Sequence, residues 1–77
     1  MGRSGDDEAA LRRLGDSLRR HREASGMSQD RLANESGLHR TYVGAVERGE
    51  RNPTYISLVR YAGALGRTVA DLVAGLP

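Results

Sequence analysis

Apolar side chains recur at helical spacing along this chain, and glycines separate the segments in which they do so. In the first segment Leu11, Leu14 and Leu18 stand at i, i+3 and i+7, which places them on one face of a helix. Gly26 would end that helix as a left-handed cap, because glycine adopts a positive φ without steric cost. The pattern therefore predicts a first helix over residues 7–25.

The first helix is preceded by a segment without such a period and contains a glycine of its own. Residues 1–6 are rich in glycine and polar side chains, and we interpret them as a flexible tail before a domain that spans residues 7–77. Gly15 lies inside the helix, where glycine costs about 1 kcal/mol relative to alanine. We therefore expect this helix to depend on packing against the rest of the fold. Its arginines, which we interpret as a solvated and salt-bridged face, are Arg12, Arg13, Arg19 and Arg20.

The middle of the chain predicts two short helices with almost no connection between them. Ser28 is a good N-cap for a helix that runs to about residue 35. Gly37 then breaks the chain, and residues 38–48 form the next helix. The positions of this pair that face the core are Leu32, Ala33, Val43 and Val46. Two helices joined in this way are typical of a helix-turn-helix unit.

The last third of the chain predicts two further helices. Residues 50–53 form a polar loop, and Thr54 caps a fourth helix that Gly66 ends. Thr68 begins a short fifth helix with the pattern of a capping box, and this helix ends near Gly75. The apolar positions of the fourth helix are Leu58, Ala62 and Leu65, with Tyr61 beside them. The predicted fold class is therefore all-α, a compact five-helix bundle with a central helix-turn-helix.

The sharp turn before the third helix decides which of its side chains point outward. Gly37 supplies the positive φ that such a turn requires, while Val43 and Val46 are committed to the core. The positions left to project together from the N-terminal half of the helix are Arg40, Thr41, Gly44 and Ala45. A protruding helix with a fork of donors, a hydroxyl group and small side chains fits the major groove of DNA.

Length and charge restrict the way in which the chain is stabilised and the partners that it can take. A domain of 77 residues buries only roughly 60–65% of the surface that its unfolded chain exposes. Because the chain has no cysteine for a disulfide, a second copy is the expected source of further stability. The net charge is only +2, but all 12 basic residues are arginine, whose planar fork suits phosphates and guanine edges. A codon bias toward arginine is the alternative explanation of that count.

Several classes of function lack a signal in this sequence. Without cysteine, the two histidines, His21 and His39, are too few to build a metal site. We find no acid–base pair, nucleophile arrangement or phosphate loop, and the carboxylates are spaced as helix-surface pairs. No apolar run approaches the roughly 20 residues that cross a bilayer, and no secretory signal is present. We therefore expect a cytoplasmic protein with no enzymatic activity, cofactor, metal, membrane contact or small-molecule effector.

The middle of the chain also carries a specific series of motifs. Gln-x-x-x-Ala-x-x-x-Gly-Leu starts at Gln29, and Tyr-Val, Glu-Arg-Gly and Arg-Asn-Pro-Thr follow it in that order. This series resembles the lambda-repressor/Cro-type (XRE-like) helix-turn-helix family over nearly the whole chain. In its small size the chain is most similar to stand-alone members of this family, such as restriction–modification controller proteins and short repressors. The resemblance implies a lambda-repressor-like bundle that binds double-stranded DNA.

The resemblance also implies roles for single residues. Base-reading positions are matched by Arg40, Thr41, Gly44 and Ala45, of which Ala45 offers only apolar contact. Phosphate-contacting positions are matched by Gln29, Arg51 and Asn52. For several of these residues a plainer role stays open, because Arg40 and Gln29 can be ordinary solvated side chains and Thr41 can serve only as a cap.

Three further positions take their interpretation from the same resemblance. His39 stands at the N-cap of the recognition helix, where the family usually has serine or threonine, so a phosphate contact and simple exposure to solvent are both open. Arg22 and Glu47 match an ion pair that ties the first helix to the third. That pair would make Glu47 structural, so its charge would not repel DNA.

The last two helices carry more apolar residues than a small core needs. We interpret the surplus as the surface of a homodimer, made by Tyr55, Val59, Val69, Val73 and Leu76. The predicted function is a transcriptional regulator whose two recognition helices read a two-fold symmetric operator, with half-sites about 34 Å apart. The alternatives are an antitoxin that regulates its own gene, and a protein-interaction module that binds no DNA.

Overall fold

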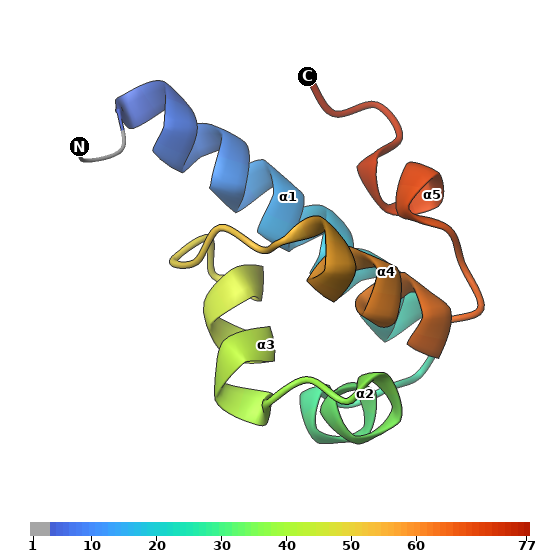
Figure 1. Ribbon diagram of the computed structural model, residues 1–77. Coiled ribbons are helices and arrows are strands. Elements are labelled where there is room, and N and C mark those ends of the chain that lie inside the picture. Colours follow the sequence, from blue (N-terminus) through green and yellow to red (C-terminus); the bar gives the residue numbers. More distant parts are fainter. Residues whose placement is uncertain (1–3) are drawn as a thin grey trace.

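Five helices and no strand make up the part of the chain that the computed structural model describes, residues 4–77 (Figure 1). They are α1 (Gly5–Ala24), α2 (Gln29–Ser36), α3 (Arg40–Glu47), α4 (Tyr55–Ala64) and α5 (Val69–Val73). The predicted all-α fold class is thereby confirmed, and each predicted helix corresponds to one of the five. No helix in this part of the chain combines the length and the apolar character that crossing a membrane requires.

The first helix begins at Gly5 and not at residue 7, because Ser4 caps it. The Asp7 amide donates to Ser4 Oγ at 3.1 Å, and the Ser4 amide donates to Asp7 Oδ2 at 3.3 Å. This reciprocal capping box satisfies two amide donors that the helix itself leaves unpaired. Of the predicted tail, residues 1–3 lie outside the described residues, whereas residues 4–6 form the cap and the start of α1.

The turn between α2 and α3 takes up more of the chain than predicted. Gly37 ends α2 in the left-handed region, with a φ of 75°, as the sequence indicates. Leu38 was predicted to be helical but lies in the turn, where its amide donates to Ser36 Oγ at 3.2 Å. His39 is the N-cap residue of α3, and its side chain makes no capping hydrogen bond.

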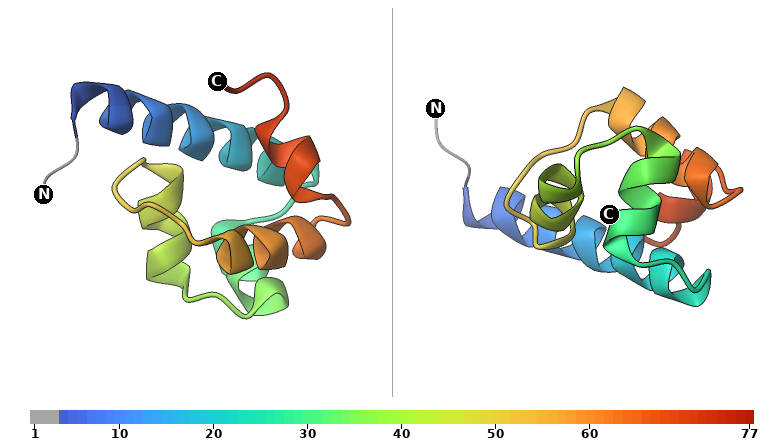
Figure 2. Two further views of the ribbon diagram at one scale, coloured as in Figure 1. Left: turned by 45° about the horizontal axis from the view of Figure 1, so that its top comes forward. Right: turned by 90° about the horizontal axis from the view of Figure 1, so that it is seen from below.

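The hydrophobic core lies where α1 is covered by the other helices. In Figure 2, α1 runs along one side of the molecule, α3 and α4 face it from the other side, and α5 closes the end beside the C-terminal half of α1. The buried apolar side chains are Leu18, Leu32, Ala33, Val43, Val46, Tyr61, Ala62 and Leu72. A buried hydrogen bond at 2.5 Å from Ser17 Oγ to the carbonyl oxygen of Leu72 fastens α5 to α1.

α1 and the C-terminal end of α3 approach each other closely. A Cβ atom at Gly15 would lie 2.7 Å from the carbonyl oxygen of Val46 and still closer to that of Glu47. Gly49, which follows α3 with a φ of 77°, rests against the backbone of Arg12 in the same way. The glycine inside α1 is therefore what allows α3 to dock, and this contact sets the position of the third helix.

Candidate nucleic-acid interface

α3 is held against α1 by a buried ion pair. Arg22 Nε lies 2.8 Å from Glu47 Oε2, and Arg22 Nη2 lies 2.9 Å from Glu47 Oε1, so the guanidinium group donates to both oxygens. Arg22 Nη1 also donates to the carbonyl oxygen of Met27 at 2.8 Å. The arginine side chain is 9% exposed and the carboxylate 2%. This pair joins the two helices that the resemblance to the family indicated.

Glu47 receives hydrogen bonds from two further helices. Gln29 Nε2 donates to Oε1 at 2.9 Å from the start of α2, and the Tyr61 hydroxyl of α4 lies 2.6 Å from Oε2 and 2.9 Å from the Leu18 carbonyl oxygen. Burial of the Glu47 carboxyl raises its pKa, but the hydrogen bonds from its partners outweigh burial and hold the pKa below its ordinary value of 4.5. Burial, together with the hydrogen bond to Glu47, also raises the pKa of the Tyr61 hydroxyl well above its ordinary value of 10.0.

This buried carboxylate therefore connects α1, α2, α3 and α4. We call the four side chains that meet there the Glu47 cluster, and its members are Arg22, Gln29, Glu47 and Tyr61. Among residues 4–77 no buried side-chain polar atom lacks a hydrogen-bond partner, so the cluster leaves no unpaired charge inside the protein. The angle between α2 and α3 is thus fixed by polar contacts as well as by apolar packing.

The outward face of α3 starts with an arginine whose position is already restrained. Arg40 Nε lies 3.1 Å from Asp30 Oδ1 of α2, and about half of the Arg40 side chain remains exposed. Thr41 is exposed, and Ala45 is partly buried. Sequence reasoning did not identify the Arg40–Asp30 pair, because neither helical periodicity nor the family motif joins these two positions.

Gly44 lies on the same face of α3 as Arg40, but it is not open to solvent as expected. Gly44 is buried, because Arg40 Nη1 and Arg48 Nη1 each lie 3.0 Å from the point where its Cβ atom would be. The absence of a side chain at Gly44 leaves room for both guanidinium groups to lie over the helix. Arg48 is thus a member of the candidate interface that sequence reasoning missed, although its spacing of i, i+4 and i+8 with Arg40 and Gly44 places it on the same face.

The predicted phosphate-contacting residues lie around this face but differ in how far their side chains are exposed and whether they already contact other residues of the protein. The Gln29 side chain is partly buried and bonded to Glu47, as described above, whereas His39 is exposed at the start of α3. Arg51 and Asn52 are exposed in the loop after α3, and the Arg51 guanidinium lies 5.6 Å from the centre of the Tyr42 ring. The positions matched by the family motif therefore surround α3 at both of its ends and at the start of α2.

The five predicted dimer residues do not share one environment. Tyr55 and Val59 of α4 are 68% and 41% exposed, and Ile56 beside them, which sequence reasoning did not include, is 59% exposed. Val69 is instead partly buried against the core. Val73 and Leu76 line a hollow with apolar side chains of α1, namely Ala10, Leu11 and Leu14. The exposed apolar surface is therefore concentrated in the first turns of α4.

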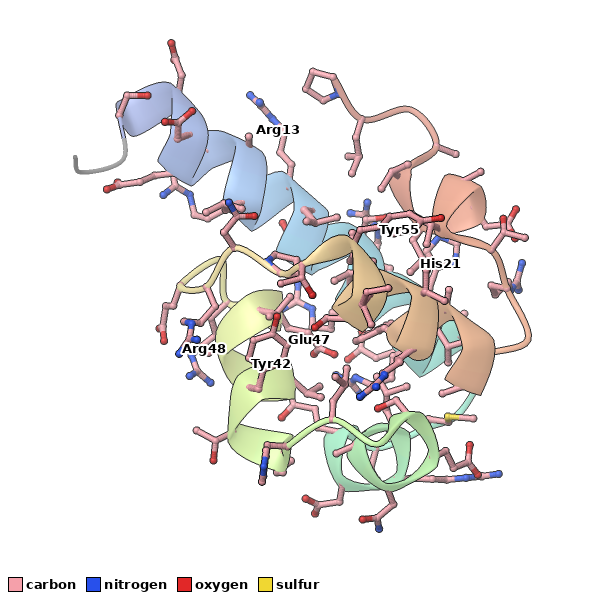
Figure 3. The ribbon with its side chains drawn as sticks, in the orientation of Figure 1. Arg13, His21, Tyr42, Glu47, Arg48 and Tyr55 are labelled. Atoms are coloured by element: carbon pink, nitrogen blue, oxygen red, sulfur yellow. The ribbon has the colours of Figure 1, made fainter. Side chains whose placement is uncertain are left out.

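In the described part of the chain, no three histidine, aspartate or glutamate side chains lie close enough together to hold a metal ion jointly. Side chains of the candidate interface are shown with their neighbours in Figure 3, where Tyr42 and Glu47 belong to α3 and Arg48, directly after it, points away from the core. The exposed side chains of this arrangement offer hydrogen-bond donors and positive charge.

Known proteins that are similar to this chain are regulators. A family model described as Helix-turn-helix matches residues 18–72. The control protein C.SmaI of Serratia marcescens is 47% identical over 60 residues, covering 78% of this chain and 71% of that protein. The structure of the restriction-modification controller protein C.AhdI from Aeromonas hydrophila superimposes with a TM-score of 0.82 at 45% identity, covering 83% of this chain and 97% of that chain. The clp gene regulator ClgR from Corynebacterium glutamicum gives a TM-score of 0.79 at 31% identity, covering 83% and 68% of the two chains.

Proposed function

The chain belongs to the Helix-turn-helix family, and from this premise we propose that it is a transcriptional regulator that binds a specific double-stranded DNA site with α3 in the major groove. The observation that carries the proposal is the exposed start of α3, where Arg40 and Thr41 project from a helix that the Glu47 cluster holds in place. Similarity to C.SmaI and C.AhdI favours a controller protein that acts in the cytoplasm on restriction–modification genes.

Base reading is assigned to the exposed positions of α3. Arg40 can donate two hydrogen bonds to O6 and N7 of guanine, a contact that discriminates against a wrong base by about 1–3 kcal/mol. Thr41 can donate to or accept from a neighbouring base, and the methyl group of Ala45 can contact a thymine methyl. Gly44 contributes no contact of its own, and its part is to let Arg40 and Arg48 lie close to the helix.

Phosphate contacts are assigned to the residues around α3. Gln29 uses one amide hydrogen for Glu47, and its second amide hydrogen can donate to a phosphate at the start of α2. The other side chains proposed to contact phosphates of the DNA backbone are exposed, and they are His39, Arg51 and Asn52. Such contacts fix the register of the protein on the duplex but carry no sequence information.

The regulator is proposed to act as a homodimer. One copy measures 33 × 25 × 19 Å and has a single α3, whereas successive major grooves on one side of a duplex are about 34 Å apart. A two-fold symmetric operator therefore needs two copies. The exposed apolar residues of α4, Tyr55, Ile56 and Val59, are the surface proposed to join them, and Val73 and Leu76 flank the hollow beside α1.

Selection of bound duplexes from a random pool tests the proposal. We expect a motif with two inverted half-sites, and Arg40→Ala should weaken binding to it by about 1–3 kcal/mol and relax the preference at one base pair of each half-site. Binding should also fall steeply as salt rises, because contacts to phosphates release counterions. A pool that shows no enrichment and no salt dependence would refute DNA binding and favour the protein-interaction module. Enrichment together with capture of a cognate toxin would favour the antitoxin.

A further inference from the structure

A cleft opens between α1 and the C-terminal end of α3, next to the side chains already described. The residues that line it are Arg12, Asp16, Arg19, Gln29, Glu47 and Arg48. The close crossing at Gly15 and the contact of Gly49 with the Arg12 backbone hold its two walls together. The cleft is therefore a fixed part of the fold, and three of its six lining residues are arginines.

The positive charge of the cleft is only partly compensated by the protein. The Arg12 side chain makes no hydrogen bond or ion pair with any residue in the described range 4–77. Arg19 lies 3.1 Å from Asp16 Oδ1, in a pair whose side chains are both about half exposed. An exposed ion pair of this kind contributes about 0–1 kcal/mol, so the Arg19 guanidinium can turn to another anion at little cost. Arg12 and Arg19 are therefore both able to receive a negatively charged ligand.

The third arginine of the cleft is held more firmly but is still open to solvent. Arg48 donates to Glu50 Oε2 at 2.9 Å and to Glu50 Oε1 at 3.1 Å, and both side chains are more than half exposed, so Nη1 remains directed toward the face of α3. Glu47 lies at the inner end of the cleft, but its charge is balanced by Arg22 at 2.8 Å. Asp16 is thus the acidic group at the mouth of the cleft that an incoming anion would meet.

The cleft is continuous with the outward face of α3. Arg48 Nη1 and Arg40 Nη1 both lie 3.0 Å from the Cβ position of Gly44, and Gln29 Oε1 lies 3.8 Å from it. A duplex that places α3 in its major groove must carry one of its strands past the side of that helix. The arginine cleft lies on the α1 side, where an arginine fork can bind a phosphate through two parallel hydrogen bonds.

We propose that this cleft binds a backbone phosphate of the DNA through Arg12, Arg19 and Arg48, so that α1 is part of the DNA interface. The inference rests on the proposed function and extends it to a helix that sequence analysis assigned only a solvated, salt-bridged face. Arg13 and Arg20 provide the contrast on the same helix. Arg13 points away from α3 on the far side of α1 (Figure 3), and Arg20 lies beside α5.

The test uses duplexes of the selected operator in which one phosphate at a time is replaced by a neutral methylphosphonate. For the unmodified protein we expect one position in each half-site, beside the strand next to α1, at which neutralisation weakens binding about tenfold. In the double variant Arg12→Gln/Arg19→Gln the effect of neutralising that position should shrink to about twofold or less, because two of the three arginines that bind this phosphate are absent. The same variant should lower the slope of log K against log salt by about 0.9 for each phosphate that the protein no longer neutralises.

The matched comparison is the double variant Arg13→Gln/Arg20→Gln, which removes the same charge from the same helix. It should keep both the sensitive position and most of the salt slope. Asp16→Asn should strengthen binding severalfold, a gain that a folding defect cannot produce. Equal reductions in affinity for the two double variants, with the sensitive position retained in both, would overturn the cleft assignment and leave the proposed function intact. Failure of the unmodified protein to bind any duplex would overturn both.

Discussion

Arg40 is the residue proposed to recognise the DNA sequence, and its exposed side chain forms an ion pair with a carboxylate. Asp30 holds the guanidinium at 3.1 Å, although a negative charge so close to the interface repels the phosphates of any duplex. Because the pair is exposed, breaking it costs little, and the main effect of Asp30 is to weaken attraction to every duplex backbone, so that binding depends more on the base contacts of Arg40. Asp30 is therefore a candidate determinant of specificity that makes no contact with DNA itself.

The substitution Asp30→Asn tests this role. We expect affinity for unrelated duplexes to rise by several fold and the ratio of specific to unrelated affinity to fall, since both the repulsion and the restraint on Arg40 are removed. Titrations of operator and scrambled duplexes by fluorescence anisotropy at several salt concentrations measure the ratio. Glu35→Gln is the comparison, because Glu35 is also an exposed acid of α2 but pairs with Arg31. An equal rise in affinity for unrelated duplexes in both variants would show that Asp30 acts only through the net charge of the protein.

Glu47 makes folding dependent on pH. Its folded pKa lies below the ordinary value of 4.5, so the unfolded chain binds more protons than the folded one as the pH falls through this region. The contribution of Glu47 is therefore complete above the unfolded pKa and is lost as the pH falls through the folded pKa. In Glu47→Gln we expect the free energy of unfolding to drop by about 3–5 kcal/mol at neutral pH, because Arg22 then lies buried without an anionic partner.

Urea unfolding followed at a series of pH values from neutral to acidic checks both parts of this prediction. The unmodified protein should lose stability on acidification, and the Glu47→Gln variant should show a flatter profile from a lower starting value. Glu35→Gln serves again as an exposed comparison and should change stability by less than about 1 kcal/mol. A variant profile parallel to that of the unmodified protein would show that other carboxylates cause the acid sensitivity.

At the scale of elements, the docking of α3 on α1 depends on one glycine. Replacing Gly15 by alanine improves the helix propensity of α1 by about 1 kcal/mol, but the new methyl group meets the Val46 and Glu47 carbonyl oxygens. Backbone cannot move aside as a flexible side chain does, so we expect a net destabilisation of about 1–3 kcal/mol. DNA binding should also weaken, because α3 must shift away from α1.

The chain offers a matched substitution on another helix. Gly63 lies in α4 and a Cβ atom there would have nothing within 4 Å, so Gly63→Ala should stabilise the protein by about 0.5–1 kcal/mol. Thermal and urea unfolding of the two alanine variants should therefore move in opposite directions. A Gly15→Ala variant that is as stable as the Gly63→Ala variant would show that α1 and α3 can separate without cost.

The same scale shows what the sequence could predict. Apolar periodicity, caps and glycines identified all five helices, because these signals are local and repeat within a few residues. Two features were missed where different helices meet: the role of Gly15 in admitting α3, and the pairing of Asp30 with Arg40. No periodic pattern records contacts between helices, and the Arg22–Glu47 contact was expected only through the resemblance to a family. Gly44 is covered instead by two arginines of its own helix face, whose positions periodicity gives but whose side-chain directions it does not.

At the scale of the whole molecule, the exposed apolar patch on α4 predicts association. Tyr55→Glu/Val59→Glu places two charges within it, and we expect a monomer at micromolar concentration where the unmodified chain sediments as a dimer. Binding to a full operator should weaken strongly, while binding to an isolated half-site should change little. Ala24→Glu, an exposed change at the end of α1, should leave the dimer intact. A dimer that survives in the double variant would place the interface elsewhere.

The buried and the exposed side chains of α3 are different residues, so the exposed ones can be substituted without disturbing the core. The inward side, with Val43, Val46 and Glu47, is buried, while Arg40 and Thr41 are exposed. On the proposed base-reading role of this pair, exchanging Arg40 and Thr41 should alter which operator is recognised at little thermodynamic cost to folding. We therefore expect new DNA specificities to be accessible on this scaffold through single substitutions, both to natural divergence and to engineering.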